Sequence, residues 1–160
     1  MALIGVRKAP HRFSHPNKLL CGSYVVELML DRKFVDWRRR PAVLKPTLPW
    51  TLTKMFRKSG KVATVMFRHP DPLGWLKQEL TRRRPVALFV RVSPRLPVAL
   101  HWIVVLAFDD ITEEFLVYDS RVGLSSVDPS LPVGNTKMSS TYLLEVWHGF
   151  PFFQYVAVTI

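Results

Sequence analysis

The chain has 160 residues, a hydrophobic fraction of 48% and a formal net charge of +11, which fits one folded domain over 1–160 and excludes a disordered chain. Its single cysteine excludes an internal disulfide framework and a cysteine-rich metal site. No segment reaches the roughly 20 apolar residues of a membrane-spanning helix, and the first residues lack the apolar run of a signal peptide. We expect a cytoplasmic protein, with a secreted effector lacking a conventional signal peptide as the alternative.

Positive charge is concentrated in the first part of the chain. Residues 1–96 hold 21 of the 23 Lys and Arg and 5 of the 12 acidic residues. Clusters such as Arg38–Arg40 and Arg82–Arg84 either keep the protein soluble or form a docking surface for an acidic peptide, nucleic acid or lipid headgroups. The sequence has no zinc-finger spacing and no glycine-aromatic motif of RNA-binding strands. Charge alone does not choose among these partners.

The first half of the chain predicts two helices between loops. The apolar residues of CGSYVVELML recur at helical spacing, and PWTLTKMFRKS has proline at its start and glycine after its end. In chain order we expect an extended lead-in over 1–20, a helix over 21–31, a basic loop over 32–48, a helix over 49–59 and a buried strand over 62–67.

The second half predicts mostly strands. We expect a turn and short helix over 69–84, strands over 85–92, 101–110 and 113–120, a loop-rich stretch over 121–140, a helix or a strand over 142–150 and a closing strand over 152–160. A short acidic turn joins the second and third of these strands and predicts a hairpin. Helices followed by antiparallel strands predict an α+β domain.

Three residues form a pattern that is typical of a cysteine nucleophile. Cys21 opens the first predicted helix, His101 opens a predicted strand, and Asp119 closes the next strand. The positive end of a helix dipole favours the thiolate, which is the nucleophilic form of cysteine. A neighbouring imidazole can take the thiol proton, and a carboxylate can orient that imidazole. Because a hairpin brings His101 and Asp119 to one edge of the sheet, we predict a catalytic triad.

Each of these residues also has an ordinary structural interpretation. A lone cysteine in an apolar stretch is most often a small core residue. A histidine at a strand start is usually a boundary residue, and an aspartate before serine commonly forms a turn. The agreement of chain order, spacing and secondary structure favours the catalytic interpretation. No cofactor or metal is predicted at the site.

Several stretches resemble papain-like peptidase domains that process double-glycine leader peptides before bacteriocin export. NKLLCGSYVVELML resembles the Asn-x-x-Cys-Gly helix start of that family, and RRRPVALFVRV with HWIVVLAFDD resembles its Pro-Val and His-Trp-Val-Val-Val strands. FLVYDSRVG resembles its Asp-Pro strand end. The resemblance covers most of residues 15–160. It implies a papain-like fold, with Cys21 as nucleophile, His101 as base and Asp119 as the residue that orients the base.

The chain departs from this family near the predicted nucleophile. The family usually has a glutamine six residues before the cysteine, where it helps to hold the oxyanion, and this chain has His15 there. His15 and the nearby Asn17 can each donate a hydrogen bond, so we expect one of them to hold the oxyanion together with the Cys21 backbone N–H. The other departures are Ser23 after Cys-Gly and Ser120 in place of proline.

These observations predict a cysteine peptidase or a related thiol amidohydrolase. Deamidation and acyl transfer use a similar triad and stay open as reaction types. Two alternatives belong to other classes: a catalytically silent papain-like domain that binds a peptide, and a basic adaptor that binds nucleic acid or acidic lipid. The excess of positive charge predicts an acidic peptide or protein as the substrate.

Overall fold

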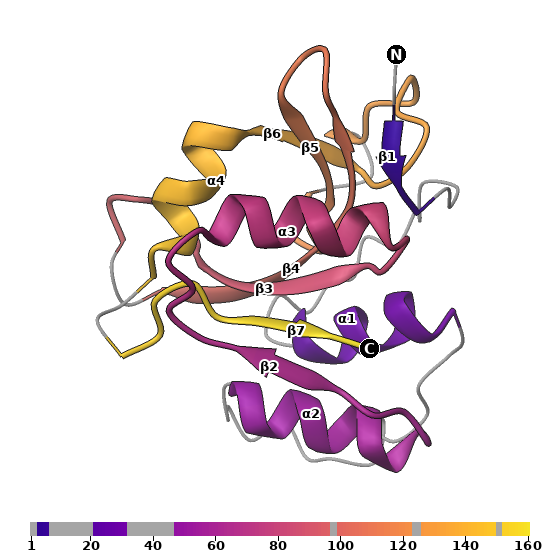
Figure 1. Cartoon of the computed structure of the whole chain (residues 1–160), viewed down its shortest axis with the longest axis vertical. Helices are drawn as coiled ribbons and strands as arrows, with labels where there is room; N and C mark the ends of the chain where they lie inside the picture. Colours follow the sequence, from indigo (N-terminus) through magenta and orange to yellow (C-terminus); the bar gives the residue numbers. More distant parts are fainter. Residues whose placement is uncertain (1–2, 7–20, 32–46, 97–98, 123–125, 150–151) are drawn as a thin grey trace.

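The computed structural model describes residues 3–6, 21–31, 47–96, 99–122, 126–149 and 152–160. In these ranges the chain forms four helices and seven strands (Figure 1). In chain order they are β1 (Leu3–Gly5), α1 (Cys21–Leu30), α2 (Pro49–Lys58), β2 (Thr64–Met66), α3 (Pro72–Thr81), β3 (Val86–Arg91), β4 (Leu100–Asp109), β5 (Glu114–Tyr118), β6 (Thr136–Ser139), α4 (Ser140–Trp147) and β7 (Ala157–Thr159). The prediction of an α+β fold is confirmed. None of the described helices is long and apolar enough to cross a bilayer.

The strands form one antiparallel sheet with β4 near its centre. The strand order is β2-β7-β3-β4-β5-β6, and β1 pairs separately with β4. The first half of β4 pairs with β3 from Leu100 onward, and its last three residues pair with β1. Since β5 occupies the other edge of β4, β3 and β1 share one edge. This double pairing explains why β4 is buried along almost its whole length.

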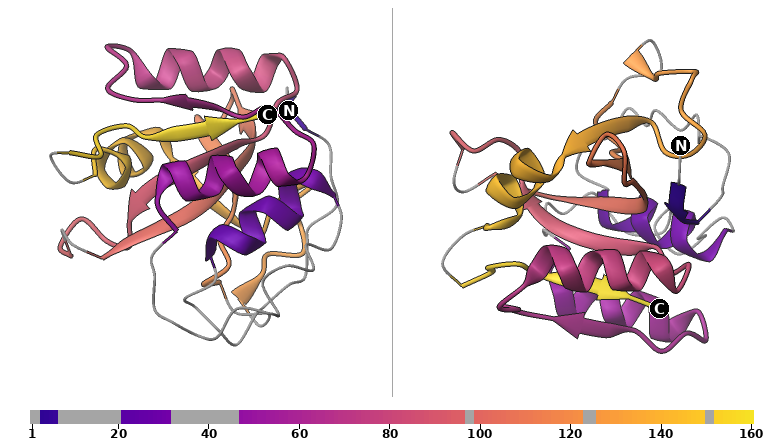
Figure 2. Two further views of the ribbon diagram at one scale, coloured as in Figure 1. Left: turned by 90° about the horizontal axis from the view of Figure 1, so that it is seen from below. Right: turned by 45° about the horizontal axis from the view of Figure 1, so that its top comes forward.

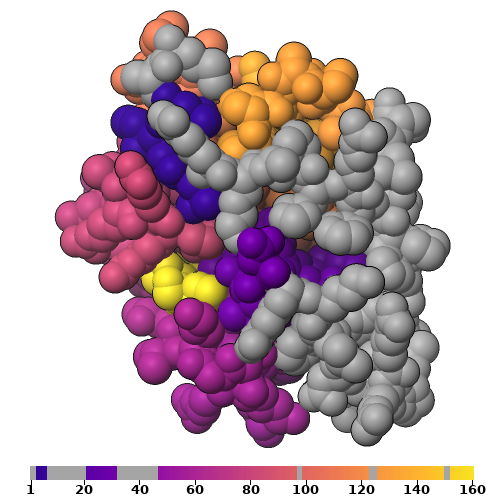
Figure 3. All heavy atoms as spheres, turned by 90° about the vertical axis from the view of Figure 1, so that its right-hand side faces the viewer, coloured from indigo at the N-terminus to yellow at the C-terminus, as the bar shows by residue number. Residues whose placement is uncertain are grey.

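Helices cover both faces of the sheet. The left-hand view of Figure 2 shows α3 on one side of the sheet and α1 and α2 on the other. Each side has its own apolar core: Val26, Phe56 and Trp102 belong to the α1–α2 side, while Leu76 and Trp147 belong to the α3–α4 side. In Figure 3 the last residues of the chain, in yellow, reach the surface between α3 and α2. The sheet is therefore the middle layer of the fold.

Local sequence explains where the helices begin. Proline occupies the first turn of α2 and of α3, where its missing N–H costs no hydrogen bond. The side chain of Asp71 caps α3 by accepting a hydrogen bond from the Gly74 N–H at 2.9 Å, and Ser139 caps α4 through the Tyr142 N–H at 3.2 Å. Of the stretch over 142–150, which the sequence left open between helix and strand, residues 142–147 are helical and form the main part of α4.

Four predicted elements differ from the structure. The extended lead-in contains β1, the loop-rich stretch over 121–140 contains β6, and the closing strand is confined to β7. The strand predicted as buried over 62–67 is the short β2, whose residues are exposed or half-buried. The physical reason is that β2 and β6 lie at the two ends of the strand order, where a strand has only one neighbour and does not need a long apolar run.

Gly134 packs so closely against β5 that a larger side chain would collide with it, and substitution of this glycine should therefore destabilise the fold. Its φ is +74°, and an added Cβ would lie 2.5 Å from the Val117 carbonyl oxygen. Gly60 has a similar φ of +77° with open space around it. We expect Gly60→Ala to lower the free energy of unfolding by about 1–2 kcal/mol through backbone strain alone, and Gly134→Ala to lower it by a further 1–3 kcal/mol or so through the collision. Urea denaturation measures both, and equal losses would contradict the close approach at Gly134.

Candidate active site

Cys21 is the first residue of α1, as the sequence predicted, and α1 lies against β4. The start of the helix is fixed by a close approach at Gly22. A Cβ added to Gly22 would lie 2.4 Å from Cγ2 of Thr47. The Trp102 indole N–H donates a hydrogen bond to the Thr47 carbonyl oxygen. The segment that leads into α2 therefore ties the start of α1 to the strand that carries His101.

His101 and Asp119 form a buried hydrogen-bonded pair. His101 lies near the start of β4, and Asp119 directly follows β5, which is antiparallel to β4. His101 Nε2 lies 2.7 Å from Asp119 Oδ1, and the two side chains are only 3% and 9% exposed. A charge-assisted hydrogen bond inside the protein is stronger than one in water, because the local dielectric constant is lower. The hairpin thus fixes the orientation of the imidazole ring.

The Cys21 thiol lies close enough to the same imidazole for each of the two groups to shift the pKa of the other. Because His101 Nε2 contacts Asp119, Nδ1 is the ring nitrogen that remains for the sulfur. The backbones of Gly22 and Trp102 also contribute to lowering the pKa of the thiol. The sulfur, the imidazole and the carboxylate are therefore neighbours between the start of α1 and the end of β5, and a hydrogen bond joins the imidazole to the carboxylate.

The three groups shift each other's pKa values toward the charged forms. Burial raises the pKa of the Cys21 thiol, but the hydrogen bond and positive charge of His101 outweigh burial and lower it below its usual value. Burial also opposes the charge on His101, yet Asp119 and Cys21 raise its pKa to about 9. The pKa of Asp119 is lowered, because His101 and the backbone of Arg121 outweigh the effect of burial. The pKa shifts of Cys21 and His101 both favour the pair of charged forms, a thiolate beside an imidazolium.

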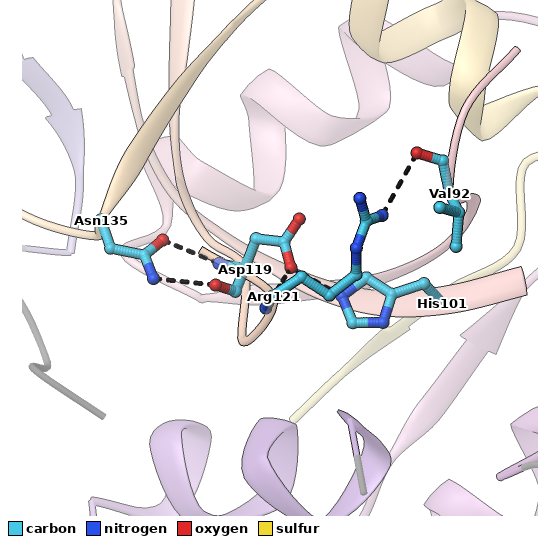
Figure 4. A network of polar contacts seen from close by, with 5 residues as sticks. All are labelled: Val92, His101, Asp119, Arg121 and Asn135. Carbon is cyan, nitrogen blue, oxygen red and sulfur yellow. Dashed lines mark hydrogen bonds and ion pairs between the residues drawn. The ribbon is translucent and has the colours of Figure 1, made fainter. Parts of the chain in front are cut away.

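Two residues outside the predicted triad hold Asp119 in place (Figure 4). The Arg121 backbone N–H donates to Asp119 Oδ1 at 2.8 Å, and its guanidinium donates to the Val92 carbonyl oxygen at 3.2 Å. The Asn135 amide contacts the backbone of Asp119 twice, accepting from its N–H and donating to its carbonyl oxygen, both at 2.8 Å. Asn135 itself is only 1% exposed.

The structure brings Cys21, His101 and Asp119 together, as the sequence predicted. His15 and Asn17, the predicted oxyanion donors, lie outside the described residues. The sequence prediction missed Asn135 and Arg121. Asn135 follows glycine in a stretch predicted as loop, so the only available signal was a buried amide in a turn, which does not reveal its partner.

Two arginines of one predicted basic cluster pair with a buried carboxylate. Arg82 Nη1 lies 2.6 Å from Glu79 Oε1, and Arg84 Nη1 lies 3.4 Å from Glu79 Oε2. Glu79 is only 3% exposed, so these two arginines neutralise a buried carboxylate at the end of α3. The positive charge that this cluster offers to a partner is reduced accordingly. The Arg38–Arg40 cluster lies outside the described residues.

Comparison with models of known protein families gave no match for this chain, and comparison with curated proteins gave no significant match. Inferences about function therefore rest on the geometry and chemistry of the site itself.

The arrangement of Cys21 and His101 predicts a reactive thiol. The rate of alkylation by iodoacetamide follows the thiolate fraction, so its midpoint pH reports the pKa of the thiol. In the wild type this midpoint should lie below the value of about 8.5 that is typical of free cysteine. In His101→Gln it should lie above that value, because the burial that raises the pKa remains while the imidazolium charge is lost.

The low-pH and high-pH limits of the thiolate–imidazolium pair have separate causes. The pair forms as pH rises through the lowered pKa of Cys21, and it is lost when His101 deprotonates as pH rises through about 9. Cys21→Ala is the control for alkylation at any other group, since Cys21 is the sole cysteine. A wild-type midpoint equal to that of His101→Gln would contradict coupling between the thiol and the imidazole.

Proposed function

We propose that this protein is a papain-like cysteine peptidase or a related thiol amidohydrolase that uses Cys21, His101 and Asp119. The observation that carries the proposal is the buried hydrogen bond between His101 and Asp119, with the Cys21 thiol beside the imidazole. A nucleophile-bearing helix packed against a sheet that carries the base supports the papain-like assignment, as do the local sequence resemblances. The pKa shifts of all three groups favour the charged forms that their proposed roles require.

The proposed reaction has two stages. The Cys21 thiolate attacks the carbonyl carbon of the amide, the new C–S bond forms, and the carbonyl π electrons move onto oxygen. When this intermediate collapses, the C–N bond breaks, and the His101 imidazolium gives its proton to the leaving amine. His101, now neutral, takes a proton from water as the water oxygen attacks the thioester. The C–S bond then breaks, releasing the acid and restoring the thiolate–imidazolium pair.

Asp119 keeps one ring nitrogen of His101 engaged throughout this cycle. Its hydrogen bond with Nε2 leaves Nδ1 available to the sulfur and supports the positive charge on the ring. A domain that only binds peptides has no chemical need for a thiol with a lowered pKa. The site therefore favours an enzyme over the silent peptide-binding alternative.

Substitutions in the triad should separate the roles of its members. We expect Cys21→Ala and His101→Ala each to abolish cleavage, because the nucleophile and the base act as one unit. Asp119→Asn should leave residual activity, since it retains the shape of the side chain but loses the charge that supports the imidazolium. The measurement is cleavage of a peptide library, read by mass spectrometry over a time course.

This experiment needs a control for contaminating peptidases. The Cys21→Ala protein, purified in parallel, provides it, and circular dichroism shows whether each variant is folded. Cleavage at the wild-type rate by folded Cys21→Ala would place the chemistry elsewhere. Library peptides that end in a new carboxylate indicate hydrolysis, whereas glutamine converted to glutamate without chain cleavage indicates deamidation.

We also propose that the substrate is acidic, because a positively charged surface adjoins the site. Residues 49–69 contain five Lys and Arg and no acidic residue. Helix α2 begins two residues after Thr47, which lies against Gly22. Lys54 and Arg57 are exposed on α2, while its opposite face packs into the core. A negatively charged peptide approaching Cys21 would be attracted by this helix.

The proposed attraction predicts a salt-dependent substrate affinity. Raising the ionic strength from roughly 0.01 M to 0.15 M should weaken binding of an acidic substrate by about threefold to tenfold, because exposed charges are screened. Lys54→Glu should reduce this dependence. Arg83→Glu makes the same change in charge just after α3, on the other face of the sheet, and should leave the dependence unchanged. Fluorescence anisotropy with inactive Cys21→Ala measures the affinity, and a salt-independent value would argue against an acidic substrate.

A further inference from the structure

We propose that Asn135 is a positioning residue that keeps the Asp119 carboxylate aligned with His101. This inference rests on the proposed function, because it assigns Asn135 a part in the same site. Asn135 does not touch the imidazole or the thiol through any hydrogen bond in the described part of the chain. It acts through the backbone of Asp119.

The contacts of Asn135 fix both backbone polar groups of Asp119. Its Oδ1 accepts from the Asp119 N–H, and its Nδ2 donates to the Asp119 carbonyl oxygen, each at 2.8 Å. The Asn135 backbone N–H donates to the Val117 carbonyl oxygen at 2.9 Å. Three hydrogen bonds therefore join Asn135 to β5 and to the residue that follows it, and Figure 4 shows the two amide contacts.

This support is needed because Asp119 lies just beyond the regular sheet. The last ladder partner of β5 toward the site is Tyr118, which pairs with Val104. Asp119 therefore has no place in the ladder, and its backbone polar groups are buried. The Asn135 amide supplies both the donor and the acceptor that a neighbouring strand would have supplied.

The preceding residue explains how Asn135 reaches this position. Gly134 adopts φ +74° and lies against the Val117 carbonyl, where a Cβ would collide. This close approach places the side-chain amide of the next residue, Asn135, beside the end of β5. On the other side of Asp119, the Arg121 N–H shares Oδ1 with His101. The Asp119 carboxylate is thus held by Arg121, and the Asp119 backbone is held by Asn135. Among the described residues, Asn135 provides the only side-chain hydrogen bonds to that backbone.

Loss of the Asn135 amide should leave the carboxylate free to move relative to His101. An error of about 1 Å in the position of a catalytic group can cost about 100-fold in rate. In Asn135→Ala we expect alkylation of Cys21 at pH 7 to slow by about tenfold or more, with a higher midpoint pH, because a misaligned Asp119 supports the imidazolium less well. Alkylation needs no substrate, so this readout is independent of which bond the enzyme cleaves.

Val133→Ala is the matched control. Val133 lies two residues before Asn135, is 1% exposed and contributes to the apolar core. Its truncation should lower the melting temperature while the pH profile of alkylation stays as in the wild type. Asn135→Ser, which replaces the amide by a single hydroxyl that can still form a hydrogen bond, should give a rate between those of Asn135→Ala and the wild type. It also serves as the test variant if Asn135→Ala does not fold.

The outcomes distinguish this inference from the proposed function. A shifted profile in the Asn135 variants with an unshifted one in Val133→Ala supports the positioning role. Wild-type profiles in the folded Asn135 variants would overturn that role and leave the proposed function intact. Equal shifts in Asn135→Ala and Val133→Ala would assign the effect to general loosening and overturn the specific role. A wild-type thiol that reacts like free cysteine would overturn both.

Discussion

The hydrogen bond between His101 and Asp119 constrains the rest of the site. It lies inside the protein, where an unpaired carboxylate or imidazolium is costly. The buried pair therefore needs further partners. These are the Cys21 thiol beside His101, the Arg121 N–H that donates to the carboxylate, and the Asn135 amide that binds the backbone of Asp119. Burial makes the charged pair costly to form. Burial also strengthens the attraction between the two charges, because little solvent lies between them to screen it.

The position of α1 follows from packing as much as from polar contacts. The helix has buried residues around most of its circumference, including Tyr24, Val26 and Met29. It lies between the sheet and the segment at Thr47, and only glycine at position 22 allows that segment to come so close. A helix fixed in this way presents its first turn to β4 with little freedom. The Cys21 thiol and the His101 imidazole are therefore carried by two elements, α1 and β4, that pack against each other.

Charge has two different uses in this molecule. At the end of α3, Arg82 and Arg84 compensate the buried Glu79, while their own side chains stay half-exposed. On α2, Lys54 and Arg57 are exposed on a helix whose start adjoins the site. Within the described residues, a buried carboxylate pairs with the arginines at the end of α3, whereas no ion pair is seen for Lys54 or Arg57.

The sequence by itself determined the helical period of α1, the proline starts of α2 and α3, the β4–β5 hairpin and the order of Cys21, His101 and Asp119 along the chain. These are local properties, set by apolar spacing and turn chemistry over a few residues. Only the tertiary structure decided that the short, polar β6 joins the sheet and that β1 pairs with the far half of β4. It alone showed that Asn135 clamps a residue 16 positions away. Such contacts join segments that are distant in the chain. The residues around an amide or a short edge strand do not indicate which distant group will form its hydrogen bonds.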